Sequence, residues 1–136
     1  NIDENGDQIG SDLKYRLDVY FNSISTKPEN YADEFNKDNL SWRYLEEFVI
    51  WCEKRDVKVY FMPPSLMKNE QYFQADRWYY ENLEKVMSQK GFNFVGNPFE
   101  YMYDKEYYFD TNYHLINEAR VFRTKKMVED LKEVLK

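Results

Sequence analysis

Cysteine and histidine each occur once in this chain of 136 residues, as Cys52 and His114. A single cysteine excludes an internal disulfide framework and a zinc site built on cysteines. With one histidine, a metal site would need three carboxylates as well, and the chain has no D-x-D-x-D-G calcium loop. We therefore expect no metal and no cofactor. Cys52 falls on the apolar side of a predicted helix, which indicates a buried structural thiol.

Long hydrophobic runs and basic runs are also missing. No stretch approaches the roughly 18 apolar residues that a membrane-spanning helix requires, and we expect no signal peptide within these residues. The net charge is −6, and an acidic chain repels phosphate backbones, so we expect no nucleic-acid partner. The chain begins with Asn1 rather than Met. From this we expect a piece of a longer protein, whose missing N-terminus could carry a membrane anchor.

Aromatic residues are abundant, with thirteen Tyr and ten Phe making up most of a 19% aromatic fraction. Hydrophobic residues reach 43% and charged residues 32%, which is the composition of one ordinary folded domain. We expect most aromatic side chains in the core, although tyrosines also line sugar-binding surfaces.

Residues 1–38 form a polar N-terminal segment with one uncertain element. Asn1–Asp12 indicates a loop or frayed terminus. Leu13–Phe21 alternates as a strand does, but its spacing also allows a helix, so both remain open. The polar residues 23–39 predict a long surface connection.

Residues 39–136 alternate between helical and strand-like patterns. Such an order predicts an α/β fold: a partial three-layer sheet with flanking helices and right-handed crossovers. Ligands bind beyond the carboxyl ends of strands in these sheets, where Pro63–Ser65, Gly96–Pro98 and Asp110–His114 are loops that could gather. The expected elements are helices over 40–55, about 70–89 and 117–135, strands over 57–62 and 92–95, and an irregular segment over 99–109.

Asp110 and His114 are the pair most able to move a proton. A carboxylate can fix the tautomer of an imidazole and stabilise its protonated form. The same residues also fit a plain structural role, in which His114 caps the last helix or bonds a backbone carbonyl and Asp110 forms a turn.

The wider string FDTNYHLINEARVFRT, over residues 109–124, resembles the C-terminal signature of SGNH/GDSL-type hydrolases. It is most similar to bacterial cell-envelope members related to polysaccharide O-acetylation proteins and the D-alanyl transfer protein of teichoic acid. The resemblance covers about residues 40–136 and implies the C-terminal portion only of a flavodoxin-like, SGNH-like domain. The matching positions are Asp110, His114, Leu115, Asn117, Arg123 and Thr124.

By this resemblance, His114 is the general base of a serine esterase or acyltransferase and Asp110 orients it. Arg123, Asn112 and Tyr113 are the residues from which we expect substrate contacts. The family spaces its aspartate and histidine as D-x-x-H, one residue closer than here, so Asn112 or a backbone carbonyl is an alternative partner for the ring. The implied substrate is an acylated glycan or another envelope polymer, in an extracytoplasmic location.

The family's nucleophile lies in a G-D-S motif, which this chain lacks. Ser11 lies in the sequence Gly-Ser-Asp, whose order differs from that of the motif. Ser65 is the serine closest to a predicted strand end, and we favour a role for its hydroxyl in the turn over a role as nucleophile. We therefore expect the chain alone to be inactive, and its truncated sheet to expose apolar surface that favours a homodimer. The alternative is a non-catalytic α/β module for assembly or for carbohydrate binding through Tyr107 and Tyr108.

Overall fold

The computed structural model describes residues 2, 4, 9–25, 40–69 and 77–136, with only the backbone described for 77–82. Helices and short parallel strands alternate along it, which confirms the α/β character of the chain. The helices are α1 (Asp18–Ser23), α3 (Leu40–Glu53), α5 (Arg77–Gln89) and α6 (Asn117–Val134); the strands are β1 (Tyr60–Phe61), β2 (Leu66–Met67), β3 (Asn93–Phe94) and β4 (Met102–Tyr103); three 3-10 turns are η1 (Leu13–Tyr15), η2 (Pro98–Tyr101) and η3 (Lys105–Tyr107).

The strands form two separate parallel pairs. β1 pairs with β3, and β2 pairs with β4. Tyr60 pairs with Asn93 in the first strand pair, and Leu66 pairs with Met102 in the second. The chain from Asn93 to Met102 is therefore three residues longer than the chain from Tyr60 to Leu66. These are accommodated by η2, where Asn97 caps the turn by accepting a hydrogen bond from the amide of Phe99.

This arrangement corrects the predicted strands. The expected strands 57–62 and 92–95 reduce to two residues each, and β2 and β4 were not predicted. Pro63 and Pro64 explain the interruption of the first segment, because proline has no N–H to donate to a ladder. β4 lies in the segment 99–109 that was expected to be irregular.

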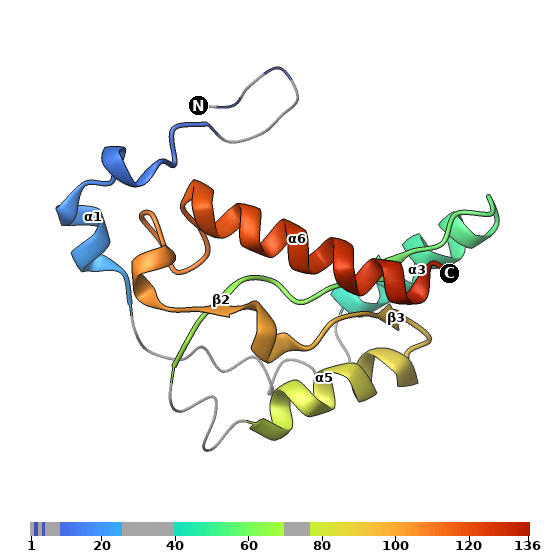
Figure 1. The fold of residues 1–136 in the computed structure, drawn as a ribbon. Coiled ribbons are helices and arrows are strands. Elements are labelled where there is room, and N and C mark those ends of the chain that lie inside the picture. Colours follow the sequence, from blue (N-terminus) through green and yellow to red (C-terminus); the bar gives the residue numbers. More distant parts are fainter. Residues whose placement is uncertain (1, 3, 5–8, 26–39, 70–76) are drawn as a thin grey trace.

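Helices lie on both sides of the strands: α6 on one side and α5 on the other (Figure 1). On the α5 side, one cluster of buried residues joins Trp42 and Val49 of α3 to Met87 and Phe92. The Phe92 ring stacks on Trp42, with centroids 6.1 Å apart. Cys52 of α3 is buried as a free thiol, as predicted.

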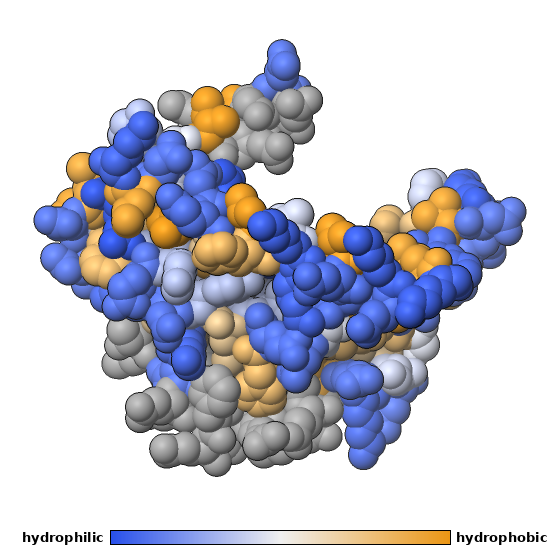
Figure 2. All heavy atoms as spheres, viewed as in Figure 1, coloured by the Kyte–Doolittle hydropathy of each residue, from blue (hydrophilic) through white to orange (hydrophobic). Residues whose placement is uncertain are grey.

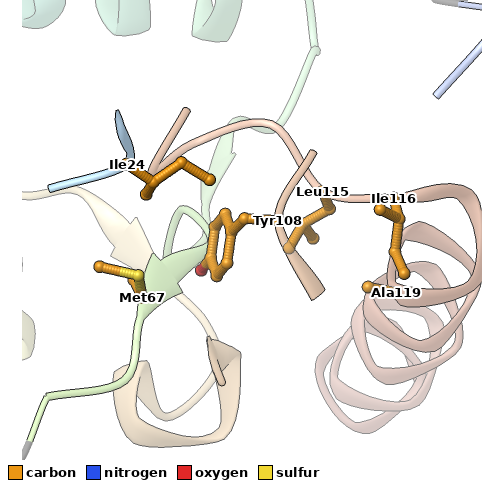
Figure 3. Packing of buried hydrophobic residues seen from close by; sticks show 6 residues of the cluster. All are labelled: Ile24, Met67, Tyr108, Leu115, Ile116 and Ala119. Carbon is orange, nitrogen blue, oxygen red and sulfur yellow. The ribbon is translucent and has the colours of Figure 1, made fainter. Parts of the chain in front are cut away.

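The second cluster lies towards α6 and supports the segment of interest. It joins Met67 of β2, Tyr108, Leu115 and the start of α6 at Ile116 and Ala119, with Ile24 closing it from the N-terminal side (Figure 3). Tyr108 and Ala119 have no exposed surface. Because Tyr108 and Leu115 flank residues 109–114, both ends of that loop are held in the core.

The N-terminal segment is helical where the sequence left the choice open. Leu13–Tyr15 and Asp18–Ser23 form η1 and α1, so the alternation in Leu13–Phe21 is not that of a strand. Ser11 is buried and donates a hydrogen bond to Asn117 of α6, so it does not belong to a frayed terminus. Arg16 also ties this segment down, donating to the carbonyls of Glu106 and Tyr108 at 2.7 and 2.8 Å.

The ends of the longer helices follow local backbone geometry. The predicted helix 40–55 ends at Glu53 and is followed by Asp56, with a φ of +58°. Gly91 follows α5 with a φ of +77°, in the role of the helix stop that the sequence predicts. The expected start of this helix at about residue 70 lies outside the described residues, and α6 spans nearly the whole predicted helix 117–135.

Hydrophobic side chains, among them Val121 and Phe122 of α6, remain on the surface in several places. Figure 2 shows them over the α1 end of the molecule, where Leu17 and Val19 are exposed. Another group of exposed hydrophobic side chains follows one face of α3. Within the described ranges, no helix is long and apolar enough to cross a membrane.

Candidate functional site

The candidate site is built on a tight loop between Tyr108 and Leu115, which form an isolated antiparallel bridge. The amide of Phe109 donates to the carbonyl of His114 at 2.7 Å. Inside the loop, the hydroxyl of Thr111 accepts from the amides of Tyr113 and His114. These bonds fix the backbone on which the histidine stands.

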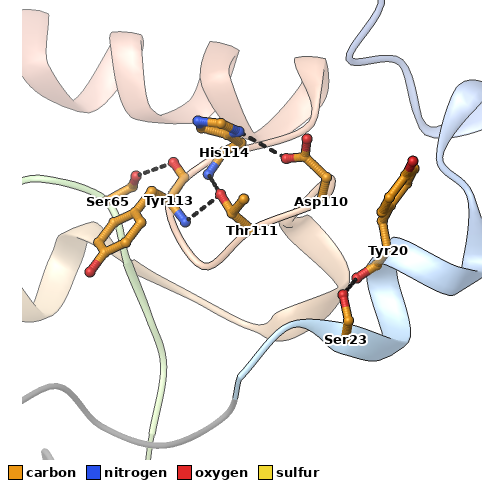
Figure 4. Close-up of polar contacts among 7 residues, drawn as sticks. All are labelled: Tyr20, Ser23, Ser65, Asp110, Thr111, Tyr113 and His114. Atoms are coloured by element: carbon orange, nitrogen blue, oxygen red, sulfur yellow. Dashed lines mark hydrogen bonds and ion pairs between the residues drawn. The ribbon is translucent and has the colours of Figure 1, made fainter.

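Asp110 and His114 are in direct contact across this loop (Figure 4). Oδ1 of Asp110 lies 2.8 Å from Nδ1 of His114. The contact shows that a carboxylate meets the ring in spite of the four-residue spacing. With a proton on Nδ1, the ring donates to Asp110 and its Nε2 is left as the basic atom. The two side chains are partly exposed, at 48% for His114 and 33% for Asp110, so solvent and solutes reach them.

Ser65 approaches this loop from the other chain segment, between β1 and β2. Its hydroxyl donates to the carbonyl of Tyr113 at 3.3 Å. Through this bond the hydroxyl joins two loops, which agrees with the structural role that the sequence favours for Ser65. Ser65 and His114 nevertheless line one small cavity of about 240 Å³. Tyr113 also lines it, and this residue is 44% exposed.

Two arginines of α6 complete the wall of this cavity, which we name the His114 pocket. Its polar lining residues are Ser65, Tyr113, His114, Arg120, Arg123 and Thr124. Arg123 donates through Nη2 to the carbonyl of Pro63 at 3.3 Å, which ties α6 to the segment before Ser65. Arg120 hydrogen-bonds the side chain of Asn117. Asn112, the remaining predicted site residue, lies in the same loop but does not line the pocket.

Asn117 has a role that the sequence did not reveal. At the start of α6 its side chain accepts from Ser11 at 3.0 Å and donates to Asp12 at 2.5 Å. It therefore holds the N-terminal segment against the helix that carries both pocket arginines. An asparagine at a helix start was the available signal, but its partners lie more than 100 positions away in the sequence.

The two tyrosines proposed for carbohydrate binding differ sharply in exposure. Tyr108 is fully buried in the core, so it cannot serve as a surface contact. Tyr107 is partly exposed and lies edge-on to Tyr103 and Phe122. The carbohydrate-binding alternative thus loses one of its two residues.

A larger hollow of about 610 Å³ lies elsewhere, near η2 and the C-terminal half of α6. Its lining includes Glu100, Asp130 and Lys126, and Lys126 is paired with both carboxylates at 2.5 and 2.6 Å. Histidine does not line it. In the part of the chain that the structure describes, no three His, Cys, Asp or Glu side chains are grouped as a metal site would require.

Comparison of the chain with protein-family models, with curated proteins and with solved structures gave no match.

Proposed function

We propose that this chain is the C-terminal portion of an SGNH-like serine esterase or acyltransferase, in which His114 is the general base and Asp110 orients it. The observation that carries the proposal is the 2.8 Å contact between Asp110 and Nδ1 of His114 beside a pocket. The α/β character and the helices on both sides of the strands are compatible with a partial flavodoxin-like sheet. The substrate class, an acylated cell-envelope glycan or polymer, rests on the resemblance of residues 109–124.

In this mechanism, Nε2 of His114 removes the proton from a serine hydroxyl that a G-D-S motif elsewhere in the protein supplies. The serine oxygen bonds to the ester carbonyl carbon, and the carbonyl electron pair moves onto oxygen. When the tetrahedral intermediate collapses, the imidazolium returns its proton to the leaving alcohol and an acyl-serine remains. Asp110 keeps the proton on Nδ1 and stabilises the imidazolium.

The environment of His114 suits this role in two respects. The ring is partly exposed, so a bulky acylated polymer can reach Nε2 without opening the core. Its backbone is fixed by Thr111 and by the buried residues at both loop ends, which limits the loss of orientation that weakens general bases on loose loops.

The test uses the full-length protein that contains this chain, with an O-acetylated glycan as substrate. We expect His114→Ala to reduce kcat for deacylation by about 10³-fold or more, and Asp110→Asn by about 10²- to 10⁴-fold because the ring loses its fixed tautomer. Asp104→Asn is the matched control, since Asp104 is an exposed aspartate outside the pocket whose carboxylate lies 3.6 Å from Nζ of Lys68. Its kcat should be unchanged.

The chain by itself should not hydrolyse p-nitrophenyl acetate in a His114-dependent manner, because it lacks the nucleophile motif. Deacylation by the full-length protein that survives His114→Ala would refute the proposed role. Hydrolysis by the isolated chain that requires both His114 and Ser65 would instead place the nucleophile within this chain.

A further inference from the structure

We infer that the His114 pocket binds an oxyanion, a phosphate or carboxylate group, through Arg123 and Arg120. That this group belongs to the substrate rests on the proposed function; that the pocket binds an oxyanion does not. The first argument is the charge of the lining. Two guanidinium groups and an imidazole line the cavity together with Ser65 and Thr124, and no acidic residue among those described does so.

This positive lining contrasts with the rest of the molecule, whose net charge is −6. Asp110 contacts the imidazole but does not line the cavity. An acidic protein that gathers cations around one pocket creates a local positive potential there, which attracts anions out of proportion to the overall charge.

Arg123 supplies the second argument, because its charge lacks a counter-charge. Among the described residues it forms no salt bridge, and its only hydrogen bond is the 3.3 Å bond from Nη2 to the carbonyl of Pro63. Its Nε is buried without an acceptor there. A partly buried guanidinium with five N–H donors and one neutral acceptor is poorly satisfied. An oxyanion in the pocket provides the missing charge and acceptors.

The bond to Pro63 also fixes where this guanidinium lies. Pro63 is fully buried and sits two residues before Ser65. Arg123 is therefore held at the pocket wall by a rigid segment rather than extended into solvent. A planar guanidinium held in place binds phosphate and carboxylate oxygens in a defined geometry, which a flexible lysine does not do.

Pocket size limits what the anion belongs to. A volume of about 240 Å³ is smaller than the roughly 300–1,000 Å³ of pockets that enclose a whole small-molecule ligand. We infer that the pocket takes one charged substituent of a larger molecule, with the remainder outside. Bound there, the substituent lies beside His114 and would position an acyl ester for attack.

The experiment measures binding without catalysis. Inorganic phosphate and, separately, acetate are added to the chain at constant ionic strength set with chloride, while NMR follows the His114 ring and the Arg123 Nε–H resonances. We expect the resonances of both groups to shift in a saturable manner. The anion that binds more tightly reports whether the site prefers a phosphate or a carboxylate. Arg123→Gln should weaken binding by at least about tenfold. Arg123→Lys, which keeps the charge and loses the planar fork, should weaken it less.

Arg43→Gln is the control variant, because Arg43 is exposed on α3 and paired with Glu47 at 3.3 Å. Its binding should equal that of the wild type. The inference is overturned if the wild-type resonances do not shift, if chloride alone reproduces the shifts, or if Arg123→Gln binds as the wild type does. The wild-type Arg123 resonance reports on the pocket even if Arg123→Gln fails to fold.

The outcome is separate from that of the proposed function. Phosphate or acetate binding in a protein without His114-dependent deacylation would leave the anion site standing and refute the esterase role. Deacylation in a protein whose pocket binds neither anion would refute the anion site alone.

Discussion

Among the described glycines, Gly96 has the least room for a side chain. It lies between β3 and η2 with a φ of +97°. A Cβ at this position would stand 2.9 Å from Oδ2 of Asp130 and 3.0 Å from the ring of Tyr101. Those two side chains are hydrogen-bonded to each other at 2.7 Å and are buried. The absence of a side chain at Gly96 therefore lets a turn close over a buried polar pair.

We predict that Gly96→Ala destabilises the protein more than Gly91→Ala. Both glycines have positive φ, and a non-glycine residue there costs about 1–2 kcal/mol. Nothing lies within 4 Å of a Cβ at Gly91, so that variant should show this cost alone. Gly96→Ala adds overlap with Asp130 and Tyr101, for a further loss of about 1–3 kcal/mol. Urea unfolding measures both, and equal losses would contradict the packing argument.

At this scale the sequence reveals short-range relations better than distant ones. The pairing of Asp110 with His114 could be predicted because both residues lie in one loop. The sequence also predicted that the loops 63–65 and 110–114 gather at one sheet edge, and Ser65 and His114 do line one cavity. The loop 96–98, expected there too, lines the larger hollow instead. Arg123 was singled out by resemblance, but its bond to Pro63 spans 60 positions and has no local signal.

Among the elements, α3 carries apolar side chains on two faces. Trp42, Val49 and Cys52 are buried against the core. On the other side, four apolar residues follow one another at steps of four, four and three, so they share one helix face. These residues are Leu40, Tyr44, Phe48 and Trp51, and each is at least half exposed. We name this face the α3 stripe, and we propose that a second copy of the chain covers it in the homodimer that the sequence led us to expect.

Phe48→Glu tests this pairing. In a two-fold dimer the same stripe meets itself, so one substitution places two charges in an apolar contact. We expect the variant to shift from dimer to monomer in sedimentation equilibrium at concentrations where the wild type is dimeric. Phe122→Glu is the matched control: Phe122 lies on α6, is 52% exposed, and its substitution should leave the dimer intact. A wild type that stays monomeric at all concentrations would refute the dimer.

The elements also show where sequence patterns lose information. The long helices were predicted because their apolar periodicity extends over many turns. The strands are only two residues each, too short for alternation to identify them. Leu66–Met67 is separated by Ser65 alone from a proline pair that argues against a strand. For Leu13–Phe21, the apolar pattern could not distinguish a strand from a helix, because η1 and α1 are largely exposed and no face of them is buried.

At the scale of the whole molecule, polar contacts as well as hydrophobic ones join η2 to α6, and one of them, between Tyr101 and Asp130, is buried. Tyr101 in η2 donates to Asp130 of α6, and Lys126 of α6 contacts both Asp130 and Glu100. Burial, together with the hydrogen bond to Asp130, raises the pKa of Tyr101 well above its ordinary value of 10.0. Hydrogen bonds to Asp130 and Glu100 raise the pKa of Lys126 above its ordinary 10.5.

These shifts predict that stability falls as the pH rises above about 10. In the unfolded chain both groups lose their protons near their ordinary pKa values, whereas the folded protein retains them. The unfolded state then binds fewer protons, so the free energy of unfolding decreases with pH; below pH 10 the full contribution is present. Urea unfolding at a series of alkaline pH values should show this decrease.

Tyr101→Phe assigns part of the alkaline decrease to one group. The variant should lose about 1.5–3 kcal/mol at neutral pH, the range for a hydrogen bond to a charged group. The unfolded wild type gains a phenolate at position 101 above pH 10 and the variant does not, so the variant's stability should fall less steeply there. Lys126 supplies part of the remaining slope, as does Tyr103, because burial raises the pKa of Tyr103 above its ordinary value as well. Tyr20→Phe, at an exposed tyrosine of α1, should match the wild type at every pH. If Tyr101→Phe and the wild type show the same alkaline slope, the buried phenol does not join η2 to α6 as we describe.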